Sequence, residues 1–296
     1  MSKTSAKRQC QKQNIIKETL PLEITSLPER YREKLETEFK ETQENKVKCL
    51  QELKDILRTE KTSHDIEFED DFLRRYLRHS QYDTSVAVAK ISNFLNLRRT
   101  HAWLFQSVQA DYRVNVSSRY CCMLPYRCPD GYCVSLTKVG QWNPEELIFH
   151  DFARISFTMN LQAIRYPLSQ VTGIKAIIDC KDTGLRHLKY CTLQNILLLY
   201  HVAIECVPIN FVNIHVVNPS FLVSLLWRMA KPILPEFVKK LFIFHSSTED
   251  LFNYFPASLI PQEYGGDLED CFMLEWLTKA KEHHKICPEG GQSNIF

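Results

Sequence analysis

The stretch GIKAIIDC, residues 173–180, decides the fold class, because it is one of several short β-rich runs that alternate with long helical stretches. The other runs are YCVSLTK at 132–138, NFVNIHVVN at 210–218 and LFIFH at 241–245. Strands that are joined through helices have crossover connections, and such connections place them parallel in one sheet. The sequence therefore predicts an α/β fold with a largely parallel sheet.

Helices fill the gaps between these strands, as apolar residues at helical spacing indicate. We predict helices from Pro144 to about Tyr166, from Cys191 to about Val207 and from Pro219 to Ala230. A last helix is expected at 270–283.

Upstream of the sheet, the chain is predicted to form a group of helices. Apolar residues at helical spacing fill 29–59, an amphipathic helix spans 68–79, and Asp83 or Thr84 can cap a third helix at 86–99. The predicted organisation is a polar tail at 1–28, a helical N-terminal domain at 29–110, the α/β domain at 111–268, and a C-terminal helix and tail at 269–296.

The composition limits the classes of protein that fit. The 296 residues carry a formal net charge of +2, so no general basic field attracts nucleic acid. The N-terminal residues lack the apolar core of a secretory signal, and the eleven cysteines do not form the C-x-x-C pairs of structural zinc sites. We expect a cytoplasmic protein with reduced thiols, no metal and no cofactor.

Sequence motifs for catalysis are missing. The eight glycines form no G-x-G-x-x-G motif, P-loop or G-x-S-x-G elbow. Asp179 and Asp182 follow a predicted strand, where α/β proteins often place catalytic groups, but the sequence pairs no serine or histidine with them. We interpret both as loop caps and expect no enzymatic activity.

Two polar residues interrupt the apolar stripe of the helix that starts at Pro144. Ser156 and Asn160 lie one turn apart, so their side chains point the same way. A buried amide without a partner costs about 1–3 kcal/mol. Either both residues bond to nearby backbone, or they are the polar anchors of a small-molecule cavity that is otherwise apolar. The pattern alone leaves both alternatives open.

The stretch LLWRMAKPILPEFVKKLF, residues 225–242, is unusually apolar for this chain. From Ser220 onward the polar residues form one narrow stripe, with apolar faces on both sides of it. Pro232 ends the helix far short of the roughly 20 residues that a membrane span requires. Such a helix is either sandwiched in the core or a lid, with one face over a cavity and the other available to a membrane.

Several motifs also occur in a fixed order along the chain. They are FLRRYLRHSQYD at 72–83, FLNLRR at 94–99, GIKAIIDC at 173–180, NIHVVNPS at 213–220, AKPILPEFVKKLFIFH at 230–245 and PQEYGGDL at 261–268. Together they resemble the CRAL-TRIO family of lipid-binding proteins, closest to its alpha-tocopherol transfer protein branch. The resemblance implies a CRAL-TRIO fold: a helical N-terminal domain, then a mixed, mostly parallel sheet flanked by helices around an apolar cavity, with a gate helix within about 219–241.

The resemblance also implies site residues, carried over by position. The lipid-binding set is Ser156, Phe157, Asn160, Ile174, Ile178, Leu185, Leu199, Val202, Ala203, Val207, Ile209 and Ile214, with Phe221 and Leu225 from the gate helix. The apolar sides of the helix at 220–230 and the lysine pair beyond it, and not the resemblance, give the expected membrane-docking set: Leu222, Leu226, Met229, Lys239 and Lys240. Ala153, Ile178 and Val207 are smaller than the aromatic residues of the related pocket, which implies room for a wider ligand.

One feature of the related branch is missing. Its basic residues that hold a phosphoinositide headgroup are replaced here by Ser80, Asn210, Val212, Phe237 and Leu241. We therefore expect little dependence on phosphoinositides, unless Arg78, Lys239 and Lys240 take over that role.

The function hypothesis is a cytoplasmic carrier, peripherally associated with membranes. It would bind a hydrophobic small molecule, such as a tocopherol, retinoid, carotenoid or other isoprenoid-like lipid, and transfer it to or between membranes. One alternative is a phosphoinositide-sensing or phospholipid-exchange protein. Another is an enzyme that uses Asp179, or a scaffold with a vestigial cavity.

Overall fold

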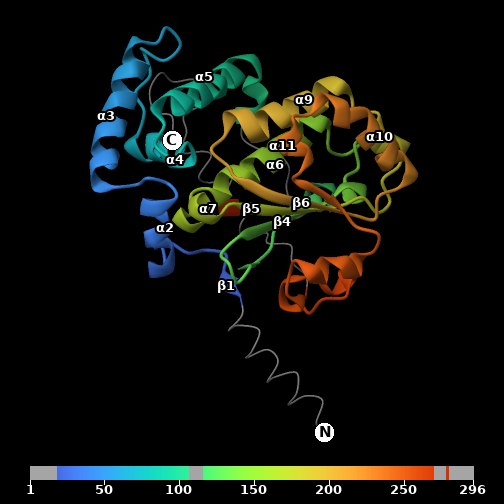
Figure 1. The fold of residues 1–296 in the computed structure, drawn as a ribbon. Coiled ribbons are helices and arrows are strands. Elements are labelled where there is room, and N and C mark those ends of the chain that lie inside the picture. The colour runs from blue at the N-terminus through green and yellow to red at the C-terminus, as the bar shows by residue number, and fades with distance from the viewer. Residues whose placement is uncertain (1–18, 107–115, 270–277, 280–296) are drawn as a thin grey trace.

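The computed structural model describes residues 19–106, 116–269 and 278–279. Its centre is a five-stranded sheet in the order β2-β4-β5-β6-β7 (Figure 1). Strand β2 (Cys121–Met123) pairs antiparallel with β4 (Cys133–Lys138), and β5 (Ile174–Asp179), β6 (Phe211–Val217) and β7 (Phe242–Phe244) continue parallel to β4. The predicted α/β fold with a largely parallel sheet is confirmed. A separate two-stranded sheet joins β1 (Leu20–Pro21) to β3 (Tyr126–Arg127).

The two faces of the sheet pack against different parts of the chain. Side chains alternate across a strand, so Ile174 and Ile177 of β5 point to opposite faces. Ile174 belongs to the larger core, together with residues of the helix α6 (Phe149–Ala163). Ile177 packs with Leu251 and Phe255 from the segment after β7. The face that carries Ile174 is therefore the one that α6 covers.

The remaining helices of this region are short. They are α7 (Pro167–Thr172), α8 (Leu185–Leu188), α9 (Leu193–Tyr200), α10 (Phe221–Ala230) and α11 (Glu236–Lys239). The helix predicted up to Tyr166 ends earlier, at Ala163, and Pro167 then starts α7 as its first residue. The helix predicted up to Val207 continues from α9 into η5 (His201–Cys206), a π-helix that the sequence did not predict.

The N-terminal helices form a group at one side of the sheet (Figure 1). They are α2 (Arg32–Thr37), α3 (Gln43–Thr59), α4 (Asp70–His79) and α5 (Thr84–Thr100). Residues 29–59 are not one continuous helix, because Lys40 adopts a left-handed conformation with φ 57°. Thr42 then caps α3, since its hydroxyl oxygen accepts a hydrogen bond from the amide of Asn45 at 3.1 Å.

Two expectations fall largely outside the described residues. The tail at 1–28 is described only from residue 19, and the helix at 270–283 only at residues 278–279. The domain boundaries stay a prediction. Across the described ranges, every helix is too short or too polar to span a lipid bilayer.

Candidate ligand-binding site

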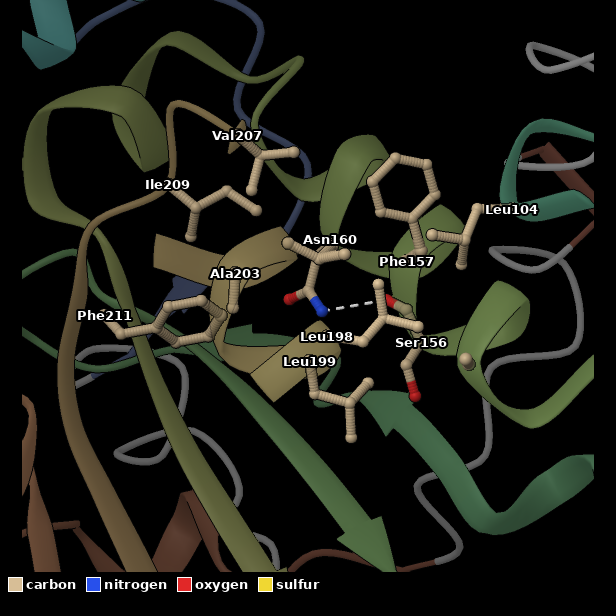
Figure 2. A pocket seen from close by; sticks show the side chains of 12 residues that line it. Leu104, Ser156, Phe157, Asn160, Leu198, Leu199, Ala203, Val207, Ile209 and Phe211 are labelled. Carbon is tan, nitrogen blue, oxygen red and sulfur yellow. Dashed lines mark hydrogen bonds between the residues drawn. The ribbon is translucent and has the colours of Figure 1, made fainter. Parts of the chain in front are cut away.

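A cavity of about 140 Å³ lies between α6, the α9–η5 segment and the start of β6 (Figure 2). Leu104 closes one side from a short 3₁₀ turn, η2 (Ala102–Phe105). The cavity is lined by Leu104, Ala153, Ser156, Phe157, Asn160, Leu198, Leu199, Val202, Ala203, Val207, Ile209 and Phe211. Only Ser156 and Asn160 are polar, and an apolar wall with few polar groups is typical of a small-molecule site.

Asn160 turns one unpaired atom toward this cavity. Its Nδ2 donates a hydrogen bond of 2.8 Å to the backbone carbonyl of Ser156, one turn earlier on α6 (Figure 2). Its Oδ1 is buried and has no hydrogen-bond partner among the described residues. The backbone of the helix therefore satisfies only half of the amide, and the role of Asn160 as a polar anchor for a ligand stays a prediction.

The hydroxyl of Ser156 belongs to a local network. It lies 2.7 Å from the hydroxyl of Tyr120, which also contacts the backbone carbonyl of Phe152. Tyr120 is itself buried, and its ring stacks on Phe152 with a centroid distance of 4.3 Å. Burial raises the pKa of the neighbouring Cys121 thiol to about 11, so this thiol is protonated and unreactive near neutral pH.

Helices α4 and α5 hold the wall of the cavity that η5 provides. Tyr76 donates a 2.9 Å hydrogen bond to the carbonyl of Cys206, and Asn93 donates one of 3.4 Å to Glu205. The ammonium group of Lys90 donates to the carbonyls of Ile204 and Val207, the latter at 3.3 Å. Four consecutive carbonyls thus receive donors from the N-terminal helices. Burial lowers the pKa of Lys90 to about 8.

Helix α10 lies over the other end of the sheet and is held loosely. Ser220 caps it by accepting a hydrogen bond from the amide of Val223. Its inner side packs through Trp227, whose ring lies 4.6 Å from Phe242 and 5.2 Å from Phe244. Ala230 is the one buried residue of the helix. On its outer side Phe221 is 80% exposed and Met229 68% exposed.

The structure brings together part of the predicted lipid-binding set. Ser156, Phe157, Asn160, Leu199, Val202, Ala203, Val207 and Ile209 line the cavity. Ile174, Ile178 and Ile214 lie outside its lining, on the sheet face that α6 covers. Leu185, Phe221 and Leu225 lie outside it because they are exposed, at 74%, 80% and 42%.

Of the predicted membrane-docking set, Met229 is exposed, whereas Leu222 and Leu226 are half-buried on the inner side of α10. The sequence pattern predicts all of these apolar residues on one face, because periodicity shows which side chains are apolar but not which of them the rest of the chain covers. Sequence reasoning did not find Leu104, Leu198 and Phe211. The wholly apolar run around Leu198 was a usable signal, but Leu104 comes from an irregular turn without periodicity.

The cationic side chains considered for a headgroup site are dispersed or paired. Arg78 donates to both carboxylate oxygens of the buried Glu41, at 2.6 and 2.7 Å, and contacts Gln170. Lys239 donates to Glu236 at 2.7 Å, while Lys240 is exposed. Ser80 is buried behind Arg78 on the same helix end. Arg78, Lys239 and Lys240 therefore do not form a basic cluster that could replace the missing one.

Asp179 has a structural role at the carboxyl end of β5. One of its oxygens accepts 2.8 Å hydrogen bonds from the amide of Lys181 and from Asn218, and the other accepts one of 2.7 Å from Tyr264. All three donors tie loops to the strand end, as the loop-cap interpretation expects. Asp182 is exposed and has a left-handed φ of 58°. Across the described residues, no group of three or more histidine, cysteine or acidic side chains could hold a metal ion.

Comparison with known proteins gives a consistent result. The sequence profile of the CRAL/TRIO domain matches residues 117–266, about half of the chain. The human alpha-tocopherol transfer protein-like protein is 25% identical over 255 residues, which cover 86% of this chain and 75% of that protein. Rat clavesin-1 is 21% identical over 248 residues, covering 82% of this chain and 70% of that protein.

Among solved structures, the crystal structure of Sfh5 is similar at a TM-score of 0.47 and 14% sequence identity. The similarity covers 82% of this chain and 98% of that one.

Proposed function

Because this chain belongs to the CRAL/TRIO family of lipid-binding and lipid-transfer proteins, we propose that it is a carrier for one hydrophobic small molecule, which it delivers to or between membranes. The observation that carries this proposal is the cavity, with its ten apolar residues and its two polar residues on one helix. Burial of apolar ligand surface contributes about 25 cal/mol per Å². A lipid with roughly 400 Å² of apolar surface would gain on the order of 10 kcal/mol on leaving water.

The cavity is smaller than a whole lipid requires. Sites for small molecules usually enclose roughly 300–1,000 Å³, whereas this one measures about 140 Å³. It fits the polar end of a ligand and the first part of its tail. The remainder would extend over the half-buried Ile178 and Ile214, toward the inner side of α10. Ile174, Ile178 and Ile214 remain candidate contacts for that tail.

Helix α10 is the gate in this proposal, with its two sides assigned from their exposure. Leu222, Leu226 and Trp227 on the inner side would cover the ligand. Phe221, Leu225 and Met229 on the outer side would enter the interface of a membrane. Exposure of the inner side is unfavourable in water but tolerable in lipid, so the membrane would supply the differential affinity that opens the gate.

The exposed leucines of α8 and α9 extend this membrane-facing surface. Leu185, Leu193 and Leu197 are exposed, and so are Arg186 on α8 and Lys189, the residue that follows α8. Apolar side chains next to cations suit the interface of a bilayer that contains anionic lipids. Leu185 is therefore better assigned to docking than to the ligand. The protein would act in the cytoplasm as a peripheral membrane protein without catalysis.

Extraction of the purified protein with organic solvent, followed by mass spectrometry, tests the proposal. A carrier should yield one apolar lipid at about one molecule per chain and should pass a labelled lipid between vesicles. Stoichiometric phosphoinositide would favour the sensing alternative instead. Protein that carries no lipid and accepts none from vesicles would exclude both.

A further inference from the structure

The proton positions around Ser156 and Asn160 show which kind of polar group the cavity can receive. A carbonyl oxygen can only accept, so the single proton of the Tyr120 hydroxyl points to the carbonyl of Phe152. Either hydroxyl could donate in the 2.7 Å contact between Tyr120 and Ser156, and we assign the donor to Ser156 because the proton of Tyr120 is already used. Ser156 consequently has only lone pairs left for a ligand.

Asn160 also offers a ligand only an acceptor, because its donor group is already used. Its Nδ2 faces the carbonyl of Ser156 at 2.8 Å, and rotation of the amide by half a turn would bring two acceptor oxygens together. The orientation of the amide is therefore fixed by its partner. The unpaired atom is Oδ1, which is an acceptor.

We propose, building on the carrier function, that this cavity selects lipids whose polar end donates a hydrogen bond, which means an alcohol or a phenol. Protein atoms cover Oδ1 of Asn160, so a ligand hydroxyl reaches it only when these atoms shift, and it then supplies the proton that Oδ1 lacks. An aldehyde, ester or carboxylate would bring a further acceptor against Oδ1, and an ether would leave Oδ1 unpaired. A buried polar atom without a partner is unfavourable, so these ligands bind more weakly.

Matched pairs of lipids test this selection. Vesicles carry equimolar amounts of an alcohol and its methyl ether, for retinol, phytol, α-tocopherol and cholesterol, and the protein is recovered by gel filtration for mass spectrometry. We expect a 10- to 100-fold excess of the alcohol over the ether for whichever pair is captured. Equal capture of both members would overturn the selection and leave the carrier function intact. Capture of no lipid would overturn both.

The Asn160→Leu variant separates the selection from general affinity. This variant should bind the ether and the alcohol within about threefold of each other, because the atom that requires a donor is gone. If Asn160→Leu does not fold, Asn160→Ala removes the same atom with less bulk. An unchanged alcohol preference in the folded variant would show that Asn160 does not select.

A second inference concerns the opposite wall of the cavity. The π-helix η5 carries Val202 and Ala203 of the lining, and its last carbonyls are held by Tyr76, Lys90 and Asn93. Lys90 is buried and spans two of these carbonyls, which are three residues apart. π-Helical turns are rare and need a specific reason to persist.

We infer that Lys90 is a positioning residue, which keeps η5 in its π form and so sets the width of the cavity. Without the ammonium group, the carbonyls of Ile204 and Val207 lose their donor, and the turn can relax toward an ordinary α-helix. Such a relaxation would rotate Val202 and Ala203 relative to Asn160.

The Lys90→Met variant tests this role, because methionine keeps the length of the side chain but donates no hydrogen bond. Amide hydrogen exchange at 201–209 should become at least tenfold faster, and the ratio of bound α-tocopherol to bound phytol should change by at least threefold. Lys90→Arg, which retains the donors, should restore both. Unchanged exchange and an unchanged ratio in Lys90→Met would overturn the inference.

Discussion

Two regions of the molecule, the η5 wall of the cavity and the helix α10 outside the cavity lining, are held by different interactions. The fixed wall is η5, whose carbonyls accept hydrogen bonds from three side chains of α4 and α5. The loosely packed region is α10, in which Ala230 alone is buried and Trp227 makes the ring contacts to β7. A carrier needs both kinds, because the shape of the site must persist while the ligand enters and leaves.

The largest difference in the free energy of unfolding is expected between a variant that loses an aromatic residue beside η5 and one that loses an aromatic residue on α10. Tyr76→Ala should lower the free energy of unfolding by about 3–5 kcal/mol, because Tyr76 is fully buried and its ring packs on Phe72 at 4.8 Å. Phe221→Ala on α10 should change it by no more than about 0.5 kcal/mol, because Phe221 is exposed. Urea denaturation of both variants measures the two free energies of unfolding. Similar losses in the two variants would refute the distinction between η5 and α10.

For membrane binding we expect the opposite: changes on α10 should have a larger effect than changes beside η5. Changing Phe221 and Leu225 together to Asp should weaken association with vesicles by about 100-fold, since each apolar side chain contributes about 1.5 kcal/mol or more when it leaves water. Vesicle cosedimentation measures this loss, and thermal denaturation of the same variant provides the control. Because both side chains are exposed, the melting temperature should hardly change. A collapsed melting temperature would mean that α10 is part of the core.

Acid should weaken the fixed wall. Burial, and then the charge of Lys90, lowers the pKa of His79 to about 4, whereas an unfolded histidine has a pKa of about 6.5. The unfolded chain therefore takes up the proton first, so stability is complete above about pH 6.5 and is lost as the pH falls toward 4. We expect a loss of about 1–2 kcal/mol between pH 7 and pH 5.

In His79→Gln, the part of this stability loss that comes from His79 should be absent. Urea denaturation of the variant at pH 7 and at pH 5 measures the loss that remains. The pKa of His215, on the sheet face opposite α6, is also lowered to about 4 by burial and by His245. Protonation of His215 in the unfolded chain should therefore still lower the stability of the variant in acid. If wild type and His79→Gln lost the same free energy of unfolding between pH 7 and pH 5, protonation of His79 would not contribute to the acid response.

The smallest effect is expected from phosphoinositide. The addition of a few percent of phosphatidylinositol bisphosphate to acceptor vesicles should change the rate of lipid transfer by less than about twofold, since Arg78 is paired with Glu41 and Lys239 with Glu236. A fluorescence transfer assay with and without the lipid measures the ratio. Acceleration of tenfold or more would mean that these pairs rearrange at the membrane.

Part of the candidate site could be predicted from the sequence. The spacing of Ser156 and Asn160 placed both on one side of one helix, and both line the cavity. Positions carried over from the family also found Val202, Ala203, Val207 and Ile209. Leu185, Phe221 and Leu225 were assigned to the ligand but are exposed and lie outside the lining, because neither family position nor helical periodicity reports which neighbours cover a side chain.

The sequence by itself determined the four parallel strands of the sheet, the main helices between them, and the segment with two apolar sides. These features follow from periodicity and from prolines, glycines and caps, which act within a few residues. The tertiary structure decided which side of α10 is exposed, that η5 is a π-helix, and that Oδ1 of Asn160 has no hydrogen-bond partner within the part of the chain that the structure describes. Such features depend on neighbours far along the chain, as Tyr76 and Cys206, 130 residues apart, illustrate. A local pattern does not specify which distant donor reaches a given carbonyl, since that depends on how the packed elements meet.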